Sequence, residues 1–83
     1  MCLSLDRRTY RQRDTGHDVY LSAGQLIQHG VRLWEVRLVR ADGQPGAVAG
    51  QTPIAWWRTC QEAREGYQER LQALREAGFV QVS

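Results

Sequence analysis

The sequence contains no lysine, and arginine supplies all eleven of its basic residues. A bias in genome composition explains this absence at least as well as selection for function does. Arginine binds phosphates and carboxylates through a planar fork of N–H donors, so an all-arginine surface suits such partners. The formal net charge is only +2, whereas strong nonspecific DNA binders usually carry a larger excess. Charge alone therefore does not indicate general DNA affinity.

Long apolar runs are also missing. No stretch approaches the roughly 20 apolar residues that a transmembrane helix needs, and no signal-peptide core follows the start. Cysteine is scarce, because Cys2 and Cys60 are the only two. We therefore expect a cytoplasmic protein with two reduced thiols and no contact with a membrane. A disulfide between these two cysteines, which lie far apart in the sequence, is the alternative.

Residues that make metal and catalytic sites are few and scattered. His17, His29 and the two cysteines stand singly, whereas a zinc site needs three or four closely spaced ligands. His17 and Asp18 are adjacent, and adjacent side chains on an extended segment point apart, so they do not form a catalytic dyad. Cys60 lies near a helix start but on an apolar stripe, which favours an inert thiol. We expect no enzyme activity, metal, cofactor or small-molecule substrate.

The chain is sufficient for one domain, residues 1–83, with a single small core. A core of this size supplies only roughly 3–5 kcal/mol. Its seven aromatic residues therefore matter, since each ring can bury about 150–250 Å². A homodimer would be one way to add buried area.

The clearest predicted element is a helix over residues 59–77. Thr59 to Glu62 form a capping box, and Gly78 is placed as a C-cap glycine. Gly66 in the middle costs about 1 kcal/mol relative to alanine, which indicates that a tryptophan ring or a backbone packs closely there. An apolar stripe recurs at helical spacing: Cys60, Ala63, Tyr67, Leu71 and Leu74.

Strands are predicted before this helix. Residues 31–40 alternate in the pattern of a strand, with Trp34, Val36 and Leu38 toward the core. Ser22 with Gln25 gives a second capping box, which predicts a short helix over 22–29. The alternative for that segment is a hairpin that turns at 22–24 and again at His29-Gly30. Weaker strands are expected at 7–13, 47–49, 54–57 and 79–82, with turns at Asp42-Gly43 and Pro45-Gly46.

The predicted fold is α+β: a small antiparallel sheet of three or four strands with one long C-terminal helix packed across one face.

Trp56 and Trp57 are consecutive, so one should enter the core while the other stays exposed as a candidate contact for a protein partner. The alternative is that the N-terminal segment covers this second tryptophan. Arginines near Tyr10 could contact phosphates while its ring stacks on a base, or form a solvated strand face. The candidate nucleic-acid-binding residues are Arg7, Arg8, Tyr10, Arg11, Arg13, Arg32, Arg37 and Arg40.

Two family resemblances are present. Gly50-Gln51-Thr52, Trp57, Glu62-Ala63, Tyr67 and Gly78-Phe79-Val80, with Leu33 to Val36, resemble WGR domains, a small module of poly(ADP-ribose) polymerases and some bacterial proteins. The namesake Trp-Gly-Arg is absent and its segment is too short, so the family's DNA-contacting role does not carry over. Leu21 to Gln25 and Gly30-Val31 are similar to the helix-turn-helix of excisionase and MerR-type proteins, which would require residues 32–41 to be helical.

Function remains a choice between two binding hypotheses. The first is a small non-catalytic protein-interaction module, such as an adaptor, an inhibitor or an oligomerising accessory protein, whose partner is another protein or a second copy. The second is a nucleic-acid-associated module that uses an arginine-rich face. Small size, modest charge and the lack of a sharp motif favour the first.

Overall fold

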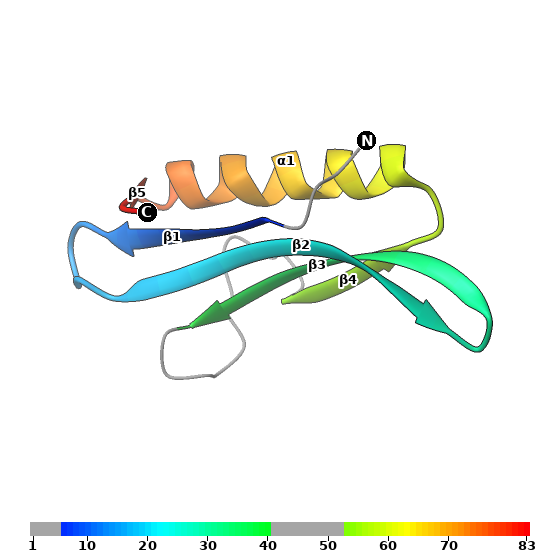
Figure 1. Cartoon of the computed structure of the whole chain (residues 1–83). Coiled ribbons are helices and arrows are strands. Elements are labelled where there is room, and N and C mark those ends of the chain that lie inside the picture. Colours follow the sequence, from blue (N-terminus) through cyan, green and yellow to red (C-terminus); the bar gives the residue numbers. More distant parts are fainter. Residues whose placement is uncertain (1–5, 41–52) are drawn as a thin grey trace.

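The computed structural model describes residues 6–40 and 53–83. Its strands form one antiparallel sheet in the order β4-β3-β2-β1-β5, and the helix lies across one face (Figure 1). The predicted α+β class is confirmed, although the sheet has five strands and not three or four. The elements are β1 (Asp6–Gln12), β2 (Asp18–Gln28), β3 (Val31–Arg40), β4 (Ile54–Trp57), α1 (Cys60–Glu76) and β5 (Phe79–Gln81).

The segment predicted as a short helix is a strand, and it accounts for the extra member of the sheet. β2 runs without interruption through 22–29 as far as Gln28. Its pairing with β3 extends from Val19 opposite Arg40 to Gln28 opposite Val31. The prediction of a helix was wrong because β2 pairs with β3 along almost its whole length and with β1 as far as Ala23. These backbone hydrogen bonds outweigh the few that a short helix could form, since such a helix leaves four groups at each end without intrahelical partners.

The turn between β2 and β3 matches one part of the alternative prediction. His29 and Gly30 have φ angles of 52° and 76°, the left-handed pair that a type I′ hairpin turn requires. The turn predicted at 22–24 does not exist. Because β3 is a strand, the similarity to a helix-turn-helix is also wrong.

Helix α1 begins and ends where the sequence predicts. Thr59 Oγ1 accepts a hydrogen bond from the Glu62 amide at 3.2 Å and donates one to Glu62 Oε1 at 2.7 Å. At the other end Gly78 takes a φ of 87° and its amide donates to the Arg75 carbonyl. These contacts satisfy backbone groups that a helix end leaves without intrahelical partners.

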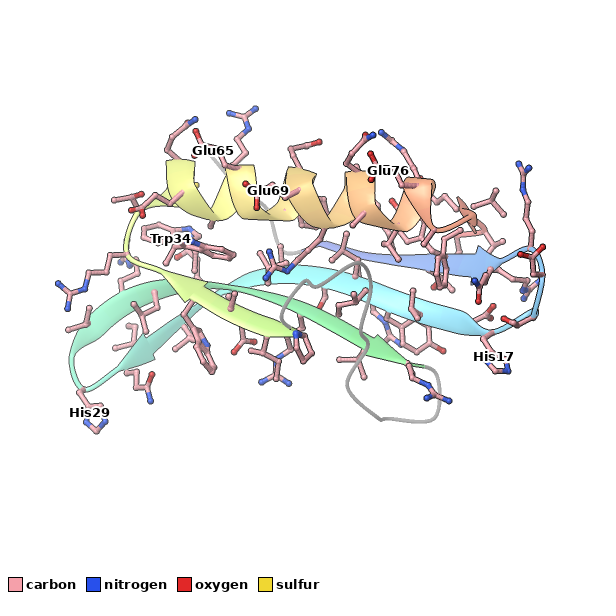
Figure 2. All side chains as sticks on the ribbon, turned by 180° about the vertical axis from the view of Figure 1, so that it is seen from behind. His17, His29, Trp34, Glu65, Glu69 and Glu76 are labelled. Atoms are coloured by element: carbon pink, nitrogen blue, oxygen red, sulfur yellow. The ribbon has the colours of Figure 1, made fainter. Side chains whose placement is uncertain are left out.

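The core lies between α1 and the facing side of the sheet. Val36 and Leu38 of β3 are fully buried, as predicted, and Trp34 of the same strand is half-buried. Figure 2 shows Trp34 between the helix and the sheet. The buried members from the sheet are Tyr10, Val19, Leu21, Ala23, Val36 and Leu38, and those from α1 include Ala63, Tyr67, Leu71, Ala73 and Leu74.

The helix connects the two edges of the sheet. It follows β4 at one edge and leads to β5, which pairs with β1 at the other edge. The contact with β1 continues past β5, because the Val82 amide donates to the Thr9 carbonyl at 2.8 Å. The strands predicted at 54–57 and 79–82 are therefore real edge strands.

Some predictions fall on residues outside the described ranges, namely the strand at 47–49 and the turns at 42–43 and 45–46.

Cys60 differs from its expected reduced state, because it is disulfide-bonded in the structure. The chain's other cysteine, Cys2, lies outside the described residues. The cytoplasmic location, which was argued partly from reduced thiols, stays a prediction.

Candidate interaction surface

The side of the sheet away from α1 carries a mixture of polar, aromatic and aliphatic side chains. Alternation along each strand places these residues opposite the core, and none of the described helices or strands packs over them. We call this side the open face; its residues are Arg7, Thr9, Arg11, Asp18, Tyr20, Ser22, Gly24, Leu26, Leu33, Glu35, Arg37, Val39, Ile54, Trp56 and Val80.

The two consecutive tryptophans lie on opposite sides of β4. Trp57 turns toward α1, where its ring packs against Gly66 and lies 5.3 Å from the guanidinium of Arg70. Trp56 turns to the open face and remains 51% exposed. The prediction that one ring enters the core and the other stays accessible is confirmed, and so is the close approach to Gly66.

The exposed ring of Trp56 is held in place by its neighbours. Its indole N–H donates to Glu35 Oε2 at 2.7 Å, and Arg37 forms an ion pair with the same carboxylate. The hydrogen bond and charge of Glu35 raise the pKa of Arg37 above its ordinary value. Because the polar end of the indole is already bonded, the part of the ring that faces outward is apolar.

The strand that carries Trp56 is an edge strand. The Leu38 amide donates to the Pro53 carbonyl across the β3–β4 pair. The register then turns the backbone groups of Ala55 and Trp57 toward β3. Those of Ile54 and Trp56 point outward, away from the sheet, because backbone direction alternates along a strand. No described strand pairs with them, and β4 itself contains no charged residue.

The arginines do not gather on one face. Arg7, Arg11 and Arg37 belong to the open face, whereas Arg8, Arg32 and Arg40 alternate to the helix side, and Arg13 follows the end of β1. Several also have partners within the chain. The Arg7 guanidinium lies 4.0 Å from the centre of the Tyr20 ring, and Arg11 pairs with Asp18 at 2.8 Å.

Tyr10 cannot stack on a nucleic-acid base, which is the role predicted for it from the sequence. Its side chain is only 3% exposed and belongs to the core cluster, so its ring is not accessible for stacking on a base. The reason is the alternation of side chains along β1, which places Tyr10 opposite Val19 on the helix side of the sheet.

The Arg11–Asp18 pair joins the end of β1 to the start of β2 on the open face, beside the hairpin turn. The Arg11 Nε donates to Asp18 Oδ1 at 2.8 Å and Nη2 donates to Oδ2 at 3.2 Å. This bidentate contact holds the pKa of Asp18 below its ordinary value, through the hydrogen bond first and the positive charge second. The pair fixes a strand end and leaves that arginine less available to another anion.

Sequence reasoning missed Arg70, a residue of α1 that is only 3% exposed because it lies on the side of the helix that faces the sheet. Its Nη1 donates to the Gly66 carbonyl at 3.1 Å, and removal from water lowers its pKa below the ordinary value. The available signal was spacing, because position 70 follows Tyr67 by three residues and precedes Leu74 by four, on the stripe that faces the sheet.

No metal centre emerges from the described side chains. Within residues 6–40 and 53–83, His, Cys, Asp and Glu do not form a group of three that could hold a metal ion. Figure 2 shows His17 and His29 at opposite ends of the sheet. A hollow of about 420 Å³ is lined by the outward side chains of α1 alone, which do not converge from several elements as a binding pocket requires.

No helix in the described part of the chain has both the length and the apolarity that crossing a bilayer demands. The resemblance to WGR domains stays a prediction, because no protein-family model, curated protein or solved structure matches the chain.

Proposed function

We propose that this chain is a small non-catalytic protein-interaction module, an adaptor, inhibitor or oligomerising accessory protein, that binds through the part of the open face around Trp56. The observation that supports this most directly is a half-exposed tryptophan whose N–H is already bonded to Glu35. Tryptophan is among the residues most enriched in interface hot spots.

Pre-organisation adds to the argument. Ordering a side chain at an interface costs about 0.5–1.5 kcal/mol, and the Glu35–Arg37 pair has already restricted the ring of Trp56. Half-buried aliphatic residues lie near it in the register, with Ile54 on the same strand and Leu33 on β3. A partner that covers the ring would therefore bury apolar area with little additional ordering.

A nucleic-acid-associated module remains the alternative proposal. Its support is weaker than the sequence suggested, because the candidate arginines divide between both faces of the sheet and Tyr10 is buried. A protein that follows a phosphate backbone needs its cations along one continuous surface.

Site-specific photocrosslinking in living cells tests the protein-binding proposal. A benzoylphenylalanine at Ile54 leaves Trp56 intact and lies on the same face of β4; the matched control carries the probe at Gln72, on the exposed side of α1. We expect discrete crosslinked proteins from position 54, none from position 72, and loss of the products when Trp56→Ser is added. Equal labelling from both positions, or none from position 54, would overturn the proposal.

A further inference from the structure

We infer that the partner of β4 is a second copy of this chain, whose own β4 pairs with it antiparallel about a two-fold axis at Ala55. This inference rests on the proposed function, because it names the partner that contacts Trp56, which a second copy reaches along the outer edge of β4. This pairing would join the sheets of the two copies into one continuous sheet, with α1 of both copies on the same side.

The backbone of β4 suits this pairing. Ile54 and Trp56 direct their N–H and C=O groups away from β3. With Ala55 on the axis, Ile54 lies opposite Trp56 of the other copy, and these are the residues whose outward groups can exchange hydrogen bonds. Pro53 does not interrupt the pairing, because its backbone faces β3.

The side chains are self-complementary in this register. On the open face each Trp56 ring lies beside Ile54 of the other copy, an aromatic and β-branched pair of the kind that stabilises neighbouring strands. On the helix side the small Ala55 lies beside its own copy. A heterologous strand would need a matching pattern, whereas a second copy supplies it by symmetry.

Apart from its short length, the edge lacks the features that normally keep edge strands apart. Natural edge strands carry charged side chains, prolines or bulges that block further pairing. β4 has the sequence Ile-Ala-Trp-Trp, with neither a charge nor a proline among its four residues. The contact is limited to one short strand and two tryptophans, so it belongs with small, weak interfaces, and we expect a concentration-dependent equilibrium of monomer and dimer.

Amide hydrogen exchange of the unmodified chain tests the pairing directly. The amides of Ile54 and Trp56 should slow at least tenfold between micromolar and millimolar protein. The amides of Ala55 and Trp57, which face β3, should be protected equally at both concentrations and serve as the internal control. Exchange at Ile54 and Trp56 that does not change with concentration would overturn the inference.

Charge substitutions test the register. In Ile54→Lys/Trp56→Lys, like charges lie opposite each other, so sedimentation equilibrium should find monomers only. In Ile54→Lys/Trp56→Glu, each lysine faces a glutamate of the other copy, so dimers should return in part at low salt. Gln72→Lys, on the outer side of α1, should dimerise like the unmodified chain. Equal association of both double variants would refute this register.

The outcomes also separate this inference from the proposed function. A chain that stays monomeric at millimolar concentration but crosslinks from position 54 to other proteins would overturn self-pairing alone. A chain that neither dimerises nor crosslinks would overturn both. Crosslinks from position 54 at twice the mass of the chain would support both.

Discussion

Gly66 and the ring of Trp57 are packed so closely that a Cβ atom at position 66 would overlap Cη2 and lie 2.5 Å from Cζ2 of the indole. Glycine in a helix interior costs about 1 kcal/mol relative to alanine. Here the absence of a Cβ atom at Gly66 lets the helix lie directly on the ring of Trp57. The relationship links α1 to the edge strand β4, and it leads to the first prediction.

Gly66→Ala should destabilise the fold, although alanine is the better helix former. Overpacking a core costs about 1–3 kcal/mol, which exceeds the gain in helix propensity. We expect the free energy of unfolding, measured by urea denaturation, to fall by about 1 kcal/mol.

A double-mutant cycle identifies the cause. In a Trp57→Leu background the ring is gone, so Gly66→Ala should become neutral or stabilising. Gln68→Ala, on the exposed side of α1, should change little in either background. A Gly66→Ala variant that is stabilised equally with and without Trp57 would show that the packing is looser than described.

The β2–β3 turn gives a second prediction. His29 holds a φ of 52°, a left-handed conformation that asparagine adopts more readily than most residues and that β-branched residues resist. His29→Asn should raise the urea midpoint slightly, and His29→Val should lower the free energy of unfolding by about 1–2 kcal/mol. His17→Val, in the other hairpin but without a positive φ, is the matched control and should show the smaller loss.

The Arg11–Asp18 pair predicts a specific pH dependence. The folded pKa of Asp18 is lowered, mainly by its hydrogen bond from Arg11, so the unfolded chain binds this proton more readily. The pair therefore stabilises the fold above the unfolded pKa of about 3.9, and that contribution is lost as pH falls through the lower folded value. Urea midpoints between pH 6 and pH 2 should fall less steeply in Asp18→Asn.

Arg11→Gln, which removes the other partner of the pair, should flatten the acid slope in the same way as Asp18→Asn. The contact between Arg11 and Asp18 is exposed, so 1 M salt should also flatten the slope. Identical slopes for Asp18→Asn and the unmodified chain would contradict the prediction.

Binding to nucleic acid distinguishes the two proposed functions. Because the arginines are divided between the faces, we expect no saturable binding of labelled duplex or single strands by fluorescence anisotropy, even near 50 mM salt. Saturable binding that weakens steeply with salt, and that Arg7→Gln/Arg37→Gln abolishes while Arg64→Gln does not, would favour the nucleic-acid module.

The elements predicted correctly are those whose local signals agree with their tertiary surroundings. The helix carries a cap at Thr59, a stop at Gly78 and a consistent apolar stripe, and β3 alternates cleanly around Val36. Each signal is contained within the element, so no knowledge of a partner is needed to interpret it.

β2 shows where local signals fail. Ser22 and Gln25 resemble a helix start, and Gly24 weakens a strand, yet Val19, Leu21 and Ala23 alternate into the core. The pairing with β3 decides the outcome, and pairing is a long-range property. The same limit applies to the site: the consecutive tryptophans showed that one ring would be exposed, but the Glu35 contact and the outward edge depend on strand register.

The connection from β4 through α1 to β5 has a consequence for synthesis. The three inner strands, β1, β2 and β3, form two consecutive hairpins, so they can pair as soon as residues up to 40 have left the ribosome. Until β4, α1 and β5 follow, neither β3 nor β1 has its outer neighbour, and Leu21, Val36 and Leu38 have no helix to cover them. The nascent chain thus depends on β4, α1 and β5 to cover both the apolar face and the two edges of the inner strands, and a product truncated before these elements should be a substrate for chaperones.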